Sequence, residues 1–240
     1  MEEGILAMSR KTIGILGGMG PAATLELFER IINNTVAEAD QDHVSLIIIN
    51  DPQIPDRTKF IMGEGPSPVE RLMDNINKLS NAGADVVIIP CMTAHSFISV
   101  LQERSPIPII NAIELVERYI QRNHPNVNKI GLLATDGSVK SGVFQQFISD
   151  EIVVPNVEKQ KELMDIIYGK EGIKSNNYHD QIFERISSIT DDLKKSNAEA
   201  IIAGCTELSL VMDEENLQIP VIDPITILAK ETVEIGTRDN

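Results

Sequence analysis

Residues 84–96 read A-D-V-V-I-I-P-C-M-T-A-H-S, and residues 198–209 read A-E-A-I-I-A-G-C-T-E-L-S. Each stretch has a small residue and an acidic residue, then a short apolar run, then a cysteine. Cys91 and Cys205 are the only two cysteines among the 240 residues. Each stands where the pattern predicts that a buried strand gives way to a helix. The sequence therefore predicts two similar halves, each presenting one thiol at an equivalent point.

A second pair of matching stretches supports the duplication. T-I-G-I-L-G-G occupies residues 12–18, and K-I-G-L-L-A-T occupies residues 129–135. The interval between them nearly equals the interval between the cysteines, so one assembly of strands and helices is used twice. We expect a first domain over residues 1–111, a second over residues 112–223, and a closing helix near residues 224–240 that packs back on the first.

The composition limits the classes of partner. The 21 basic and 36 acidic residues give a formal net charge of −15, which repels nucleic acid and anionic lipid. The beginning of the chain lacks the basic and apolar segments of a secretion signal, and no apolar run is long enough to span a membrane. Two cysteines make no disulfide framework, and a reducing compartment would keep them as thiols. We expect a cytoplasmic protein that binds neither nucleic acid nor membrane.

Apolar runs alternate with amphipathic segments along the whole chain. Strands are predicted at residues 13–16, 44–49, 86–90, 107–110, 130–133, 152–155, 200–203 and 219–222. Helices are predicted at residues 22–37, 69–82, 93–102, 112–122, 142–148, 159–168, 179–196 and 225–235. This alternation predicts an α/β fold of parallel sheets flanked by helices, with ligands outside the carboxyl ends of the strands. The continuous apolar run at 44–49 predicts a strand buried on both faces, and proline and glycine in residues 52–68 predict a long functional loop.

Two thiols at equivalent points suit one particular chemistry. A thiolate is a base and a nucleophile, and the N-terminus of a helix lowers the pKa of a thiol. If the halves face each other across a cleft, Cys91 and Cys205 reach opposite faces of one bound carbon. One can remove a proton while the other returns one, which inverts the carbon by general acid-base catalysis. The alternative is a pair of buried structural cysteines, and their equivalent positions favour the catalytic interpretation.

Four motifs, in order along essentially the whole chain, resemble those of the cofactor-independent aspartate/glutamate racemases. They are I-G-I-L-G-G-M-G-P-A-A-T at residues 13–24, P-C-M-T-A-H at 90–95, G-L-L-A-T-D-G-S-x-x-S-G at 131–142 and G-C-T-E-L at 204–208. G-G-M-G-P resembles the aspartate racemase branch. The resemblance implies two pseudo-symmetric α/β domains around a cleft, no pyridoxal phosphate or metal, a homodimer, and a small dicarboxylic amino acid as substrate. It also implies that Cys91 and Cys205 are the two bases, Cys205 acting on the L-enantiomer and Cys91 on the D-enantiomer.

The resemblance also assigns the groups that hold the substrate. It implies that Thr93 binds the α-carboxylate, with Thr135 and Thr206 as the matching residues of the second half. Arg57, in I-P-D-R-T, would hold the side-chain carboxylate as a bidentate fork, with Lys174 as the second cation. Taken without the resemblance, Arg57 could instead pair with a neighbouring aspartate, and Lys174 could be a solvated surface charge.

The remaining candidates surround these groups. Asn50 ends a predicted strand and is expected to face the cleft, and Met19 lies in the glycine loop after the first strand. Met92 departs from the family, which usually has asparagine there, so the preferred substrate is open. His95 and Glu207 are candidates for supporting the groups that touch substrate, and Glu207 adjoins a thiol.

Other interpretations stay open. The spacing Gly18-x-Gly20-x-x-Ala23 after a strand resembles a dinucleotide fingerprint, although Pro21 interrupts it and no acidic residue follows at the usual spacing. A non-enzymatic small-acid binding protein would not need a thiol in both halves. A maleate isomerase or hydantoin racemase would use two cysteines but matches G-G-M-G-P and I-P-D-R-T less well, and a one-cysteine decarboxylase is disfavoured by the second thiol.

Overall fold

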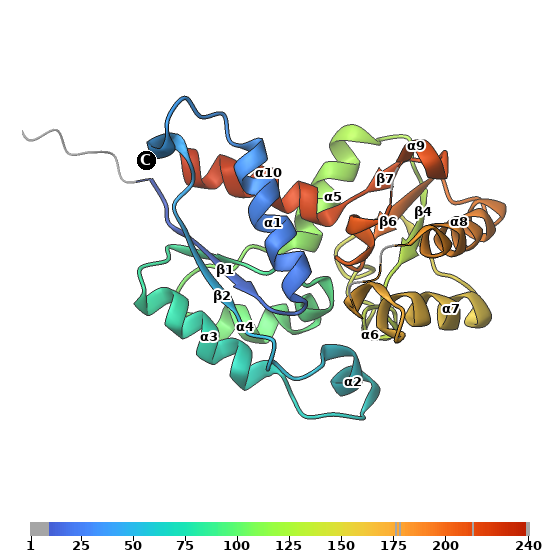
Figure 1. Cartoon of the computed structure of the whole chain (residues 1–240), viewed down its shortest axis with the longest axis horizontal. Helices are drawn as coiled ribbons and strands as arrows, with labels where there is room; N and C mark the ends of the chain where they lie inside the picture. Colours follow the sequence, from blue (N-terminus) through green and yellow to red (C-terminus); the bar gives the residue numbers. More distant parts are fainter. Residues whose placement is uncertain (1–9, 176, 178, 213, 239–240) are drawn as a thin grey trace, which may run out of the picture.

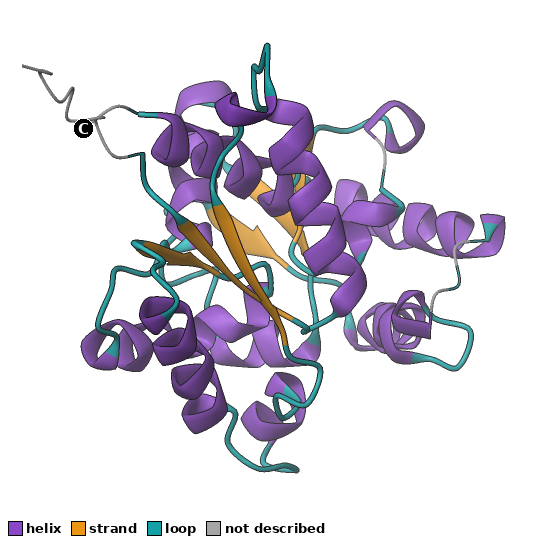
Figure 2. Cartoon of the chain, turned by 60° about the vertical axis from the view of Figure 1, so that its left-hand side comes forward, coloured by secondary structure: helices purple, strands orange, loops and turns teal. Residues whose placement is uncertain are grey.

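Two parallel sheets form the centre of the molecule (Figures 1 and 2). The computed structural model describes residues 10–175, 177, 179–212 and 214–238. The first sheet has the order β2-β1-β3 and the second the order β5-β4-β6-β7. The strands are β1 (Ile13–Gly17), β2 (Leu46–Asn50), β3 (Val86–Ile88), β4 (Lys129–Leu133), β5 (Glu151–Val153), β6 (Ala200–Ala203) and β7 (Val221–Ile222). This arrangement confirms the predicted α/β fold.

Helices connect and cover the strands of both sheets. The α-helices are α1 (Pro21–Asn34), α2 (Arg57–Met62), α3 (Val69–Asn81), α4 (Ile98–Arg104), α5 (Ala112–Asn123), α6 (Asp136–Ser141), α7 (Val157–Tyr168), α8 (Asp180–Lys195), α9 (Glu214–Leu217) and α10 (Pro224–Thr237). Short 3-10 turns η1 to η4 lie at Asp40–Asp42, Met92–Phe97, Ile173–Ser175 and Leu208–Leu210. No helix in the described part of the chain is long and apolar enough to cross a membrane.

The two sheets repeat the same local packing. Gly14 of β1 pairs with Val87, and Gly131 of β4 pairs with Ile201, in equivalent parallel registers. A Cβ atom on Gly14 would lie 3.1 Å from the Cβ of Ala84. A Cβ on Gly131 would lie 2.5 Å from a methyl carbon of Ile201. In both halves a glycine therefore lets the chain before the cysteine pack closely on the central strand.

The acidic residue of each repeated stretch also performs the same task. Asp85 accepts a hydrogen bond from the Thr12 amide at 2.7 Å, and Glu199 accepts one from the Asn128 amide at 2.6 Å. Each carboxylate thus satisfies the amide just before the neighbouring strand. Gly83 and Asn197 precede these stretches with left-handed φ angles of 97° and 66°, a conformation that glycine and asparagine tolerate best. The matching residues of the two stretches thus make matching contacts, which supports the duplication indicated by the sequence.

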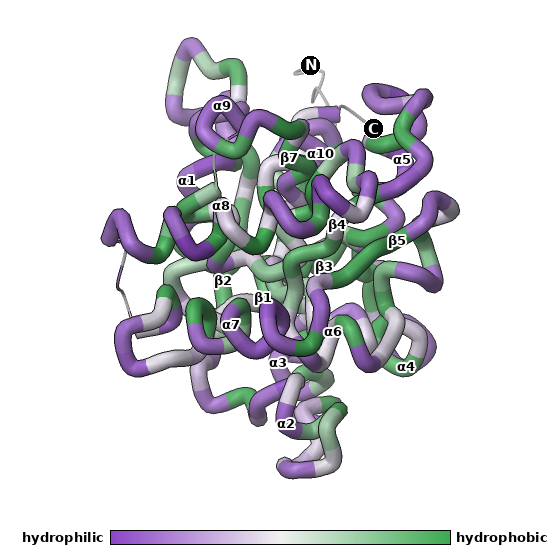
Figure 3. Tube along the Cα trace, turned by 90° about the vertical axis from the view of Figure 1, so that its right-hand side faces the viewer, coloured by the Kyte–Doolittle hydropathy of each residue, from purple (hydrophilic) through white to green (hydrophobic). Residues whose placement is uncertain are grey.

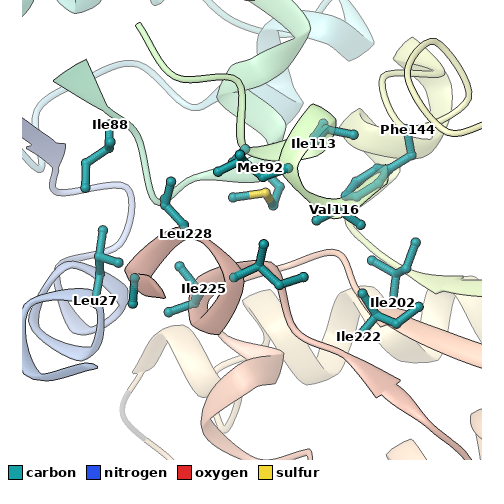
Figure 4. Close-up of a cluster of buried hydrophobic side chains, with 14 of the residues drawn as sticks. Leu27, Ile88, Met92, Ile113, Val116, Phe144, Ile202, Ile222, Ile225 and Leu228 are labelled. Atoms are coloured by element: carbon teal, nitrogen blue, oxygen red, sulfur yellow. The ribbon is translucent and has the colours of Figure 1, made fainter. Parts of the chain in front are cut away.

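One buried apolar cluster reaches from the first sheet to the second. It contains Ile88 and Leu27 from the first half, Ile202 from the second, and Leu228 of α10 (Figure 4). Helix α10 packs on both α1 and α5. Apolar segments run through the interior while most polar segments lie outside (Figure 3). Burial of this shared surface stabilises the two sheets against each other, while the boundary at residue 111 stays a prediction.

Several expected elements differ in the structure. The strand expected at 44–49 is the edge strand β2, which pairs only with β1. Ile48 is 39% exposed, so the strand is not buried on both faces. Residues 52–68 are not wholly irregular, because Asp56 caps the short helix α2 by accepting from the Lys59 amide. The strand at 107–110 is reduced to a single bridge between Val87 and Ile109.

In the second half, the helix expected over residues 142–148 is wrong. The helical turn lies earlier, in α6, because Thr135 caps it and Gly142 ends it in a left-handed conformation. Most of residues 134–141 are therefore helical.

Candidate active site

The two thiols lie just beyond the carboxyl ends of equivalent strands. Cys91 follows β3 and Cys205 follows β6, and both are buried and free. Both cysteines line the same inner pocket. Its other lining residues are Met19, Arg57, Met92, Thr93, Thr135, Tyr168, Lys174, Thr206 and Glu207. The structure thus gathers nearly all of the site residues predicted from the sequence around one small space.

Two cavities meet at this place. The inner pocket between the thiols has a volume of about 10 Å³, which is room for about one water molecule. The outer cavity has a volume of about 710 Å³. Four residues line both spaces and form the partition between them: Met19, Arg57, Lys174 and Glu207. An amino acid entering from the outer cavity therefore meets these side chains before it reaches the thiols.

Cys205 has a charged partner. Its thiol donates to Oε2 of Glu207 at 2.9 Å, and Oε1 of the same carboxylate forms an ion pair with Nζ of Lys174. Burial raises the pKa of the Cys205 thiol well above its ordinary value, and the negative charge of Glu207 adds to the effect. This corrects the expectation that a helix N-terminus lowers the pKa of this thiol, because desolvation and a like charge outweigh it.

The Glu207 carboxylate is held in its charged form. Although burial acts in the opposite direction, the Lys174 ammonium and the hydrogen bond from Cys205 keep the pKa of Glu207 below its ordinary value. Burial likewise opposes the charge of Lys174, but Glu207 and its neighbours raise the pKa of the ammonium. Lys174 Nζ also lies 5.4 Å from the centre of the Tyr168 ring. Lys174 is therefore a partly buried, paired cation and not a solvated surface charge.

Arg57 is a buried cation, held by backbone oxygens. Its guanidinium donates to the carbonyls of Pro55 at 3.2 Å and Met19 at 3.1 Å. Of the two aspartates that could have paired with Arg57, Asp51 pairs with Arg71 at 2.7 Å and Asp56 accepts from the Lys59 amide at 2.8 Å. Burial opposes the charge of Arg57, while the nearby thiol of Cys91 and other acidic groups raise its pKa. The Nε–H of Arg57 is buried and has no partner among the described residues, which leaves a donor for a ligand.

Hydroxyl groups form a connected cluster beside the inner pocket, which Thr93 and Thr135 line. The Thr93 hydroxyl lies 3.1 Å from that of Thr135 and 3.0 Å from that of Ser138. The Thr58 hydroxyl donates to Thr135 at 3.2 Å. The Tyr168 hydroxyl lies 3.5 Å from that of Thr58. This cluster connects residues from both halves, and its hydroxyls can donate to a carboxylate that enters the pocket.

His95 supports the loop that carries the first thiol. Its Nε2 accepts a hydrogen bond from the Ala112 amide at 3.1 Å, so Nδ1 carries the proton and donates to the Cys91 carbonyl at 3.1 Å. Burial lowers the pKa of His95 to about 4. His95 is therefore a neutral side chain that fixes Cys91 against the start of α5.

The other predicted residues differ in their positions. The Met92 side chain packs in the apolar cluster beside Ile113 (Figure 4). Its thioether therefore contributes to the hydrophobic core. The Thr206 hydroxyl contacts Glu207 at 3.3 Å. Asn50 is exposed at the end of β2 and lines neither cavity, and its contact with substrate stays a prediction.

Three residues that contact the site residues were not singled out from the sequence. Thr58 and Ser138 stand inside quoted motifs, so the signal existed but their roles were not assigned. Tyr168 ends α7 without any motif, and only the packing of α7 near α2 reveals it: its hydroxyl donates to Asp56 at 3.3 Å.

The glycine loop after β1 does not form an open cradle for a dinucleotide. A Cβ on Gly18 would lie 2.4 Å from backbone atoms of Asp51, and the Gly18 amide already donates to the Thr24 hydroxyl at 2.9 Å. The close approach that glycine permits is thus used within the chain. Among the described residues, no group of three or more His, Cys, Asp or Glu side chains could hold a metal ion.

Comparisons with known proteins agree with this geometry. The family model described as Asp/Glu/Hydantoin racemase matches residues 16–232. The chain is 26% identical over 229 residues to the broad specificity amino-acid racemase RacX of Bacillus subtilis, covering 92% of this chain and 96% of that protein. The structure of Picrophilus torridus aspartate racemase superposes with a TM-score of 0.81 at 29% identity and 96% coverage of both chains. A glutamate racemase from Francisella tularensis shares the fold, with a TM-score of 0.67 at 17% identity over 95% of this chain and 81% of that one. With its thiols, cations and hydroxyls gathered in one pocket and a family match over most of its length, the chain belongs to the Asp/Glu/hydantoin racemase family.

Proposed function

We propose that the protein racemises a small dicarboxylic amino acid, aspartate or glutamate, by two-base proton transfer between Cys91 and Cys205. The observation that carries the proposal is that the two thiols line one pocket from equivalent strand ends. The relatives named above, an aspartate racemase among them, support the substrate class.

The site contains groups suited to each part of such a substrate. Arg57 is a buried cation and Lys174 a partly buried one, and both lie on the partition toward the outer cavity, where a side-chain carboxylate would lie. The hydroxyls of Thr93, Thr135 and Thr206 lie at the inner pocket, where they can donate to the α-carboxylate. Donors held in place before the substrate binds stabilise the charge that develops when the α-proton leaves. In this reaction one thiolate removes the α-proton, and the opposite thiol protonates the other face of the carbon.

The size of the inner pocket adds a requirement. An amino acid is much larger than the space between the thiols, so the partition residues must move before the substrate α-carbon can lie there. Thr58 of α2 approaches Thr135 beside α6 across the cleft, so a small separation of α2 from α6 would widen the pocket. The closed arrangement then excludes water from the reacting carbon.

The test is solvent exchange measured by NMR. The protein is incubated in deuterated water, without added cofactor, with L-aspartate, D-aspartate, L-glutamate or D-glutamate. We expect deuterium at the α-carbon of both enantiomers of the preferred substrate. Cys205→Ser should lose exchange of the L-enantiomer more severely, Cys91→Ser that of the D-enantiomer, and neither should racemise at a useful rate. Full racemisation by either variant would refute the two-base mechanism.

The quaternary state and location belong to the same proposal. We propose a cytoplasmic homodimer, and sedimentation of the purified chain measures its mass directly. A monomer that is fully active would contradict the dimer.

A further inference from the structure

The Lys174–Glu207 ion pair occupies the route between the two cavities. Both residues line the outer cavity and the inner pocket. The side chain of Glu207 is 4% exposed and that of Lys174 is 21% exposed. A dicarboxylic substrate that enters from outside brings a second carboxylate to Lys174 while Glu207 still holds it.

The same carboxylate is also the hydrogen-bond acceptor of the Cys205 thiol, at 2.9 Å. One oxygen of Glu207 thus faces the cation and the other faces the thiol. A carboxylate that is neutralised by an ammonium is a weak proton acceptor, whereas one that loses its ammonium in a buried site is a stronger one. The partner of Lys174 therefore sets how readily Glu207 can take the thiol proton.

We propose that Lys174 exchanges partners, leaving Glu207 for the side-chain carboxylate of the substrate, and that Glu207 thereby becomes the proton acceptor of Cys205. This inference rests on the proposed function and deepens it. Substrates without a side-chain carboxylate leave the ion pair in place and the thiol protonated. Selectivity for dicarboxylic amino acids is thus built into the activation of the base as well as into binding.

The protons balance over one turnover that starts from an L-substrate. The Cys205 S–H bond breaks and an O–H bond forms on Glu207, which gives a thiolate and a carboxylic acid. The thiolate then takes the α-proton, and the Cys91 thiol gives its proton to the opposite face of the carbon, leaving Cys91 as the thiolate. When the product departs, Lys174 returns to Glu207, and the carboxylic acid releases its proton to solvent while Cys91 regains one.

The binding arm of the test uses succinate, a dicarboxylate that cannot be racemised, with butyrate as the monocarboxylate control. Calorimetry gives the Kd of each for the unmodified protein, Glu207→Gln, Lys174→Met and the double variant. We expect Glu207→Gln to bind succinate about tenfold more tightly, because no ion pair has to be broken. This gain in affinity should vanish when Lys174 is already methionine. The Kd for butyrate should change little in any of the variants. Lys170→Met removes an exposed lysine of the same segment and is the matched control.

The double variant separates partner exchange from simple repulsion between anions. Tightening that persists in the Lys174→Met background, or an unchanged Kd in Glu207→Gln, overturns the exchange of partners.

The catalytic arm follows α-proton exchange. Glu207→Gln should lower exchange of the L-enantiomer about 100-fold or more while KM falls, because general base catalysis contributes on this scale. Glu207→Asp should recover part of that exchange. L-exchange that is equal in Glu207→Gln and the unmodified protein overturns the role of Glu207 as the proton acceptor.

The two failures are distinguishable. If the unmodified protein exchanges no α-proton of any of the four amino acids, the proposed function fails, whatever the binding cycle shows. If the protein racemises an amino acid but the effects of Glu207→Gln and Lys174→Met on the Kd for succinate are additive, the further inference alone fails.

Discussion

Equivalent residues around the two thiols carry different chemistry. Thr93 follows Cys91 by the same interval as Glu207 follows Cys205. A hydroxyl therefore accompanies one thiol and a carboxylate the other, which makes the two thiols unequal within a symmetric backbone. This inequality is expected where a site must treat the two faces of one carbon differently.

Arg57 provides a test of how the side-chain carboxylate is held. Arg57→Lys keeps the positive charge but loses the fork that contacts Pro55 and Met19. We expect KM for the dicarboxylic amino acid to rise about tenfold or more and kcat to fall, because a misplaced α-proton leaves the reactive geometry. Arg71→Lys, in an exposed pair with Asp51, is the control and should change neither parameter. Unchanged steady-state kinetics in Arg57→Lys would assign Arg57 to the structure of the loop.

His95 makes the free energy of unfolding depend on pH in the acidic range. Its folded-state pKa of about 4 lies below the ordinary value of 6.5, so the unfolded chain binds a proton more readily. The neutral side chain contributes its full stability above about pH 6.5, and this contribution is lost as the pH falls toward 4. The loss is about 1.4 kcal/mol per pH unit in that window.

Urea unfolding between pH 7 and pH 4 measures this dependence. His95→Gln cannot take up a proton there, so its free energy of unfolding should fall less steeply than that of the unmodified protein. Parallel curves would show that His95 does not titrate on unfolding.

At the scale of elements, the turn between β1 and α1 depends on glycine for two separate reasons. Gly18 has a φ of 95°, and a Cβ atom added to it would overlap the backbone of Asp51. Gly63 has a similar φ of 85°, but a Cβ atom added there would meet nothing within 4 Å. The two glycines therefore separate backbone strain from steric overlap.

We expect Gly63→Ala to cost about 1–2 kcal/mol, the cost of a left-handed alanine. Gly18→Ala should cost about 1–3 kcal/mol more, because its methyl group would overlap the Asp51 backbone. The free energies of unfolding in urea give both values. Equal costs would show that the chain at Asp51 moves aside freely.

At the scale of the whole molecule, one apolar cluster couples the two sheets through α10. Leu228 is fully buried in this cluster (Figure 4). Leu228→Ala should lower the free energy of unfolding by about 2–5 kcal/mol through lost burial and the remaining cavity. Val36→Ala, at a residue that is 95% exposed, should change it by less than about 0.5 kcal/mol. Urea denaturation followed by circular dichroism decides between this and a surface role for α10, in which both variants would behave alike.

The sequence by itself determined the features that depend on local patterns. The apolar runs located most strands, and the repeat placed each cysteine at the carboxyl end of an equivalent strand. Two equivalent halves that face one cleft then predicted one site for both thiols. Short elements such as α2 and α6 escaped prediction, because six residues carry too little periodicity and their caps become evident only in the fold.

Only the tertiary structure decided which charged groups meet. Lys174 pairs with Glu207, 33 residues away in the chain, and Arg57 binds backbone carbonyls in place of the nearby aspartates. The packing of α7 beside the cleft likewise brought Tyr168 to the site. The energy of an ion pair depends on the distance between the charges and on their burial, and both are set by segments that are remote in sequence. The thiols and the adjoining Glu207 could be found by pattern, but the contact between Glu207 and Lys174 could be found only in three dimensions.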